Sequence, residues 1–201
     1  MPDSVLVIAC GALVREITEL KNQYGWDHLD LKCIDAKLHM RPALIAPRLK
    51  DMIAKYRGTY DEIFVAYADC GSVGEIDKVL AAENVERLPG VHCYQFFAGH
   101  DRFAQMSDAE PGTFYLTDFL ARHFDQFVTK PLKFEEHPEL RELYFGNYTK
   151  MTFLSQKHDP ELLANAREIA AKLDLEFEHA HVGYGELESG LRVVAERNAH
   201  G

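Results

Sequence analysis

The chain has 201 residues, of which 47% are hydrophobic and 11% aromatic, and its formal net charge is −10. This length is enough to bury one sizeable core, so we expect a single domain over residues 1–201. The acidic excess repels phosphates, which disfavours nucleic acid and anionic membranes as partners.

The N-terminal stretch MPDSVLVIACGAL lacks the basic segment of a signal peptide, and its apolar run is too short for a membrane span. We therefore expect a cytoplasmic protein with no membrane partner. Disulfides are rare in that compartment, so the four cysteines are expected to be thiols or metal ligands.

The first part of the chain alternates apolar runs with amphipathic segments. The run SVLVIA at 4–9 predicts a strand covered on both faces. Next, Leu13, Ile17 and Leu20 form one stripe of a helix that is expected to stop at Gly25. Further strands are expected at 29–34, 62–67 and 91–94, with helices after Pro42 and from Gly74.

The second part repeats the alternation, with strands expected at 112–117, 150–156 and in LEFEHAHVG. Helices are expected in DFLARHFDQFV, HPELRELYFGN and GELESGLRVVAERN, and in a helix with Asp159 as N-cap and Pro160 at its first position. Strands that alternate with helices predict an α/β fold, with a wound, mainly parallel sheet and helices on both faces, Rossmann-like. The segment 98–112 is expected to be a long functional loop.

Three cysteines lie at predicted strand ends. Cys10 ends the first strand, Cys70 follows the third, and Cys93 lies in or at the end of the fourth. Ligands of open parallel sheets bind outside the carboxyl ends of the strands, so three thiols could converge there. Three thiolates leave one position open on zinc, or on one iron of an iron–sulfur cluster. Cys33, inside a strand, is expected to be a core residue.

Two other interpretations of the cysteines remain open. One of them could be a reactive nucleophile, or all could be inert thiols packed in the core, because cysteine is among the most buried residue types. The cysteines are far apart in the sequence and match no local zinc motif.

Candidates for other roles are weaker. His100 could be a fourth ligand or an acid or base, and Glu110 could be a general base, although a glutamate before Pro-Gly is typical of a solvated turn. Arg141 could bind a substrate carboxylate with two hydrogen bonds or pair with neighbouring glutamates. His179 and His181 are two apart on a strand and could share a face.

Several stretches together resemble a bacterial and archaeal family catalogued as domain of unknown function 1638. These are IACGAL-x-REI, Y-x-DCG, HCY-x-FFAG, EPGTF-x-LTDFL-x-RHFD and HPELR-x-x-YFGNYT. The resemblance extends from Val5 to about Gly190, and the stretches that carry it include Cys10, Cys70 and Cys93 but not Cys33. The family label supplies no activity. Such proteins are loosely associated with gene neighbourhoods for corrinoid-dependent methyl transfer, which implies a methyltransferase or corrinoid protein as a possible partner.

We therefore expect a metal-dependent enzyme with zinc on Cys10, Cys70 and Cys93. It would act on a small-molecule substrate, with methyl or other group transfer as the reaction class and His100 and Glu110 as candidates for proton transfer. One alternative is an iron–sulfur cluster on the same cysteines. Another is a non-catalytic accessory protein that binds a metal or a corrinoid.

Overall fold

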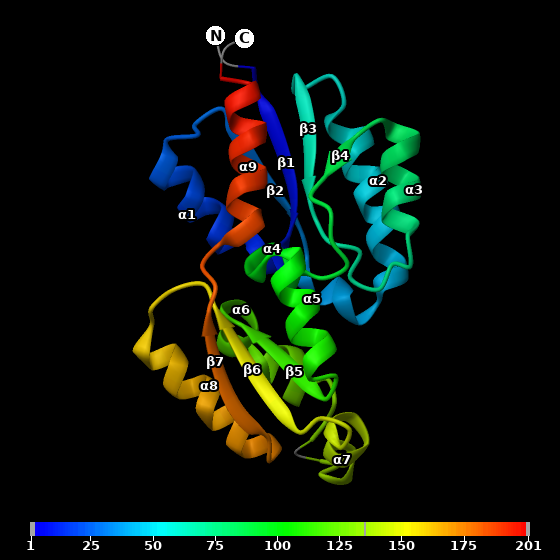
Figure 1. Ribbon diagram of the computed structural model, residues 1–201. Helices are drawn as coiled ribbons and strands as arrows, with labels where there is room; N and C mark the ends of the chain where they lie inside the picture. The colour runs from blue at the N-terminus through cyan, green and yellow to red at the C-terminus, as the bar shows by residue number, and fades with distance from the viewer. Residues whose placement is uncertain (1–2, 135, 200–201) are drawn as a thin grey trace. The chain divides into compact units, whose positions relative to one another are not determined.

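The computed structural model describes residues 3–134 and 136–199, which divide into two compact units. The first unit runs through Phe96 and resumes at Tyr184, and the second is Phe97–Gly183. Each unit has a parallel sheet with helices, so the predicted α/β class is confirmed (Figure 1). The strands form two sheets, one in each unit.

The sheet of the first unit has the order β2-β1-β3-β4, and all its strands are parallel. Its strands are β1 (Val5–Cys10), β2 (Leu29–Ile34), β3 (Glu62–Ala66) and β4 (Glu86–Arg87). Every residue of β1 is buried, as its continuous apolar run predicts. The chain goes from β1 outward to β2 and then returns past β1 to β3. The direction of winding therefore reverses between β1 and β3.

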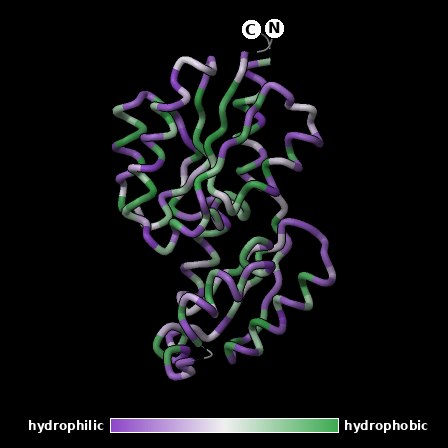
Figure 2. Tube along the Cα trace, turned by 180° about the vertical axis from the view of Figure 1, so that it is seen from behind, coloured by the Kyte–Doolittle hydropathy of each residue, from purple (hydrophilic) through white to green (hydrophobic). Residues whose placement is uncertain are grey.

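Two pairs of helices cover the faces of this sheet. Figure 1 shows α1 (Val14–Tyr24) and α9 (Gly185–Arg197) on one face, and α2 (Ile45–Tyr56) and α3 (Glu75–Glu83) on the other. Figure 2 shows hydrophobic residues along the strands between them. Gly25 ends α1 in the left-handed conformation, with a φ of 64°, so the predicted stop is confirmed. Short 3₁₀ helices precede α1 and α2, namely η1 (Gly11–Leu13), η2 (Ala36–Met40) and η3 (Pro42–Leu44).

The second unit has a parallel sheet of order β5-β6-β7, made of β5 (Thr113–Thr117), β6 (Lys150–Ser155) and β7 (Glu176–His181). Its core contains Phe153 of β6 and Ile169 of α8. Asp159 caps α8 by accepting a hydrogen bond from the Leu162 N–H, so the predicted N-cap is confirmed. The helices are α5 (His100–Ala109), α6 (Asp118–Arg122), the π-helix η4 (Asp125–Thr129), α7 (Glu139–Phe145) and α8 (Pro160–Leu173).

Two predictions about local structure are wrong. The segment 98–112 is mostly the helix α5, in agreement with its helix-forming Ala, Gln and Met residues. Residues 91–94 do not form a strand, because Pro89 and Gly90 end the extended segment and Cys93 begins the helix α4 (Cys93–Ala98). Within the part of the chain that the structure describes, no helix has both the length and the apolar character needed to cross a membrane.

Candidate functional site

Cys10 and Cys70 follow neighbouring strands at the carboxyl edge of the first sheet. Cys10 is the last residue of β1, and Cys70 lies four residues beyond the end of β3, which pairs with β1. The winding of the sheet reverses between these two strands. In open α/β sheets this switch point is where ligands bind, because the connections leave in opposite directions and open a crevice.

The backbone around Cys10 is tightly enclosed. Its sulfur accepts a hydrogen bond from the Ala12 N–H at 3.4 Å, and the residue is buried. A Cβ at Gly11 would lie 3.0 Å from both the Ala36 nitrogen and the Ile34 oxygen. The glycine after Cys10 is therefore required by a close approach of the neighbouring backbone, which explains one of the two Cys-Gly junctions.

The turn that carries Cys70 holds an unusual backbone conformation. Cys70 has a φ of 48°, in the left-handed region that residues other than glycine rarely adopt. The Asp69 carboxylate stabilises the turn by accepting hydrogen bonds from the Ser72 hydroxyl at 2.6 Å and the Gly74 N–H at 2.8 Å. Burial opposes ionisation of Asp69, but these hydrogen bonds hold its pKa below the usual range. Strained residues fixed in this way concentrate at functional sites.

The structure brings Cys93 to the same place. Burial raises the pKa of the Cys93 thiol well above its ordinary value, and the nearby Cys70 and Cys10 sulfurs raise it further. The pKa of Cys70 is raised to about 12, first by burial and then by Cys10, while a hydrogen bond from the Cys93 N–H opposes the rise. Burial likewise raises the pKa of Cys10 to about 11. The Cys70 N–H also donates to the Val91 carbonyl oxygen at 2.9 Å, which holds the chain just before Cys93 beside Cys70. With their pKa values raised, all three thiols are protonated at neutral pH.

Two aromatic side chains, His39 and Tyr67, adjoin the cysteines. The Cys10 sulfur lies 3.9 Å from both His39 ring nitrogens, and the His39 ring stacks on Tyr67 with centroids 5.8 Å apart. Burial lowers the pKa of His39, with a smaller contribution from His92, so the imidazole is neutral. Burial and the three neighbouring thiols raise the pKa of the Tyr67 hydroxyl, which has no partner of good hydrogen-bond geometry among the described residues.

Sequence analysis missed both of these residues. Tyr67 directly follows β3, so its position at a strand end was a usable signal. His39 lies in η2, five residues beyond the end of β2, at the same edge of the sheet. The histidine-rich composition gave no reason to single it out, because its proximity to Cys10 depends on how η2 folds back over the sheet.

The other predicted residues lie elsewhere. Cys33 is exposed on the edge strand β2, so the expectation that it is a core residue is wrong. His100 begins α5 in the second unit, and Glu110 follows the same helix. The Glu110 carboxylate accepts from the Lys150 ammonium at 2.6 and 2.5 Å. A catalytic role for His100 and Glu110 stays a prediction.

The donor atoms at the edge of the first sheet suit a soft or borderline metal. Thiolates and a neutral imidazole are the ligands that zinc and iron–sulfur clusters take in proteins. In the described residues, no three His, Cys, Asp or Glu side chains are already arranged so that they could hold a metal ion. A metal would have to displace the thiol protons and draw the sulfurs together, so its affinity would rise with pH.

A family model described as "Protein of unknown function (DUF1638)" matches residues 33–191. The match contains Cys33, Cys70 and Cys93 and begins after Cys10, whereas the stretches noted in the sequence include Cys10 and omit Cys33. Searches among curated proteins and among solved structures gave no match.

Proposed function

Because the chain belongs to the DUF1638 family, whose description names no activity, we propose a function from the chain's own residues. We propose a cytoplasmic metal-dependent enzyme that holds zinc with Cys10, Cys70 and Cys93 and acts on a small molecule. The main support is the position of Cys10 and Cys70 at the switch point of the first sheet, together with the hydrogen bond at 2.9 Å from the Cys70 N–H to the carbonyl oxygen of Val91, two residues before Cys93.

Three thiolates leave one position of a tetrahedral zinc open, as in catalytic sites. Zinc supplies Lewis acidity there and lowers the pKa of a bound water or substrate thiol. His39 is suited to accept the released proton, because it is neutral and its Nδ1–H is engaged with the Ala36 carbonyl oxygen at 2.9 Å, which leaves a lone pair on Nε2. Transfer of a methyl or another group to the activated atom is the reaction class that we would test first.

Metal analysis of protein purified with and without air tests the proposal. We expect one equivalent of zinc per chain, lost in Cys10→Ala, Cys70→Ala and Cys93→Ala. Cys33→Ala is the matched control, because it removes an exposed cysteine at the edge of the same sheet. Cobalt(II) added to the metal-free protein should give the near-ultraviolet sulfur-to-metal absorption of thiolate ligands, and the Cys10, Cys70 and Cys93 variants should weaken it.

Other outcomes separate the alternatives. A brown protein with visible absorbance after anaerobic purification would replace zinc by an iron–sulfur cluster on the same cysteines. Metal binding without turnover, together with co-purification of a methyltransferase or corrinoid protein, would favour an accessory role. Protein that holds no metal under either condition would contradict the proposal.

A further inference from the structure

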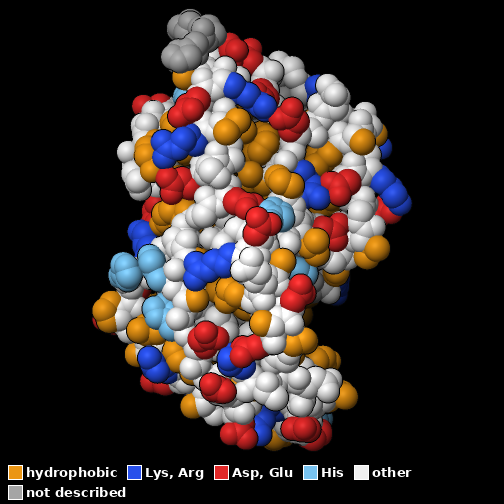
Figure 3. Space-filling view, in the orientation of Figure 1, with side chains coloured by type: hydrophobic (Ala, Val, Ile, Leu, Met, Phe, Trp, Pro, Cys, Tyr) orange, Lys and Arg blue, Asp and Glu red, His pale blue; other side chains and the backbone are white. Residues whose placement is uncertain are grey.

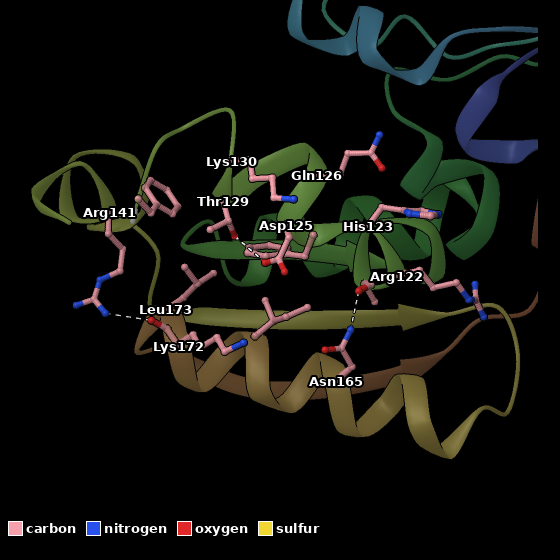
Figure 4. A pocket seen from close by; sticks show the side chains of 14 residues that line it. Arg122, His123, Asp125, Gln126, Thr129, Lys130, Arg141, Asn165, Lys172 and Leu173 are labelled. Atoms are coloured by element: carbon pink, nitrogen blue, oxygen red, sulfur yellow. Dashed lines mark hydrogen bonds between the residues drawn. The ribbon is translucent and has the colours of Figure 1, made fainter. Parts of the chain in front are cut away.

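The second unit contains a groove between η4 and α8 with a volume of about 510 Å³ (Figure 4). This volume lies within the range of about 300–1,000 Å³ that small-molecule sites occupy. Its polar lining includes Gln126, Thr129, Lys130, Arg141, Asn165 and Lys172. All of the lining belongs to the second unit, so the groove is independent of the cysteines.

One wall of the groove is a π-helix. The Lys130 N–H donates to the Asp125 carbonyl oxygen at 2.9 Å, which is the wide-turn hydrogen bond of this element. The Thr129 hydroxyl donates to the Asp125 carboxylate at 3.1 Å across the same turn. Segments of π-helix are rare, and they occur frequently at functional sites.

The groove concentrates positive charge in a chain whose formal net charge is −10. Arg122 is neutralised by Asp159 at 3.3 Å. By contrast, Lys130, Lys172 and Arg141 have no ion-pair partner among residues 3–134 and 136–199. Among the lining residues, Asp125 of η4 carries the one carboxylate. Counted over the described residues, the lining therefore carries an excess of positive charge, which attracts an anion.

Arg141 is held at one end of the groove. It donates to the Lys172 carbonyl oxygen at 3.0 Å, and Figure 4 shows this bond. No ion pair joins Arg141 to Glu139 or Glu142 in the described residues, so the pairing with neighbouring glutamates considered from the sequence is not formed. The remaining N–H groups of the guanidinium stay available for a ligand.

Apolar side chains complete the lining, namely Phe134, Ile169 and Leu173. Figure 4 shows Lys130 and Lys172 on opposite walls. We propose that this groove binds a small organic phosphate, with the phosphate between Lys130, Lys172 and Arg141 and the organic part against the apolar residues. Lysine is a common phosphate ligand as a point charge, and arginine adds a planar fork of donors.

Lys172 also lies in the last turn of α8, where the helix dipole favours a cation. That role needs one cation, whereas three cations that have no ion-pair partner in the described part of the chain line the same groove. A purely structural role therefore explains Lys172 but leaves the grouping of the three unexplained. Phosphate binding explains all three together.

Isothermal titration of the full-length protein with phenyl phosphate and with inorganic phosphate at low ionic strength tests the proposal. Phenyl phosphate should bind more tightly than inorganic phosphate, because its ring adds apolar contact. The Lys130→Gln/Lys172→Gln double variant should weaken phenyl phosphate at least about tenfold, since each cation lost removes a charge-assisted hydrogen bond. Lys50→Gln/Lys55→Gln is the matched control, because it removes the same charge from exposed positions on α2.

Circular dichroism checks that both double variants are folded. We expect that they are, because all four substituted lysines are exposed. Amide chemical-shift changes at Thr129 and Leu173 on titration would place the ligand in the groove. The proposal is overturned if phenyl phosphate shows no saturable binding, or if the two double variants bind it equally. Cysteine variants should leave this binding unchanged, so its failure is distinguishable from failure of the metal proposal.

Discussion

The Cys10 sulfur lies 3.9 Å from both ring nitrogens of His39, whose Nδ1 is 2.9 Å from the Ala36 carbonyl oxygen. A carbonyl oxygen can only accept, so Nδ1 carries the proton and Nε2 keeps its lone pair. Metal-bound histidines commonly have this arrangement, in which the other nitrogen donates to a backbone carbonyl. The imidazole is thus fixed in the tautomer that a metal site or a proton transfer requires.

Replacing His39 tests this arrangement. If zinc binds the cysteines, His39→Gln should lower the zinc affinity by about 10- to 100-fold, the usual effect of losing a neighbour that orients a metal ligand, here the Cys10 sulfur. Competition with a chromophoric chelator at constant pH measures the affinity. His137→Gln is the control, because it removes an exposed histidine on the second unit. Equal zinc affinities of His39→Gln and His137→Gln would show that His39 takes no part in the metal site.

The raised thiol pKa values predict a pattern of chemical modification. With pKa values of about 11 for Cys10 and about 12 for Cys70, little thiolate is present at neutral pH, so alkylation by iodoacetamide should be slow. Zinc should slow it further at Cys10, Cys70 and Cys93 while leaving Cys33 unchanged. Mass spectrometry of digested protein measures each rate separately.

Cys33 makes this comparison specific. Partial burial of its thiol raises the pKa to about 11 as well, although the residue as a whole is exposed on the edge strand β2. Cys10 and Cys33 therefore have similar thiol pKa values, but the alkylating reagent reaches the exposed Cys33 more easily than the buried Cys10. If zinc protected Cys33 as strongly as Cys10, the effect would be a general response of the protein rather than binding at the cysteines.

Local patterns were enough to predict most of the fold. The apolar run of β1, the glycine after α1 and the Asp159-Pro160 start of α8 are signals that a few consecutive residues carry, and each is found in the structure. The position of Cys10 at a strand end follows from the same patterns. Its neighbour Cys70 follows because parallel strands share an edge.

Features that depend on tertiary packing could not be predicted in this way. The VHCYQFF segment has the aromatic and β-branched composition of a strand, yet Cys93–Ala98 forms the helix α4, in which the successive residues Phe96 and Phe97 are both buried. His39 approaches Cys10 through the fold of η2, and the cations of the groove come from segments far apart in the sequence. No local periodicity records such contacts.

The core of the first sheet should be sensitive to the loss of volume. Ile8, in the centre of β1, is fully buried, so Ile8→Ala removes packed methyl groups and leaves a cavity. We expect a loss of about 2–5 kcal/mol in the free energy of unfolding, measured by urea denaturation. Val193→Ala on α9, where the valine is 60% exposed, should change it by at most about 0.5 kcal/mol. Similar losses for both would contradict the assigned burial.

A group of histidines lies at the carboxyl edge of the second sheet. The Ser155 hydroxyl is 2.9 Å from His179 Nε2 and 3.1 Å from His181 Nδ1, and His158 stacks on His181 with centroids 4.0 Å apart. Figure 3 shows histidine side chains gathered on this face of the second unit. Burial lowers the pKa of His179, with further lowering by His181, Arg167 and His158, whereas Asp118 opposes it.

This pKa shift gives the stability of the second unit a predicted dependence on pH. The folded state favours neutral His179, while a histidine of the unfolded chain has a pKa of about 6.5. Once the pH falls below about 6.5, the unfolded state therefore binds more protons than the folded state, and the free energy of unfolding decreases. This decrease stops when the pH is below the pKa of His179 in the folded state. Hydrogen exchange of the β7 amides, measured between about pH 5 and 7.5, should therefore slow less on acidification than the intrinsic exchange rate does, so that the protection of these amides falls.

Measuring β7 separates this effect from that of His39, whose pKa is also lowered but which lies in the first unit. His179→Gln should flatten the profile, because the glutamine amide does not titrate, and His137→Gln should leave it unchanged. A profile that keeps its full slope in His179→Gln would mean that protonation of other groups governs this edge of the sheet. In that case protonation of His179, which lies 2.9 Å from the Ser155 hydroxyl, would not affect the stability of the second unit.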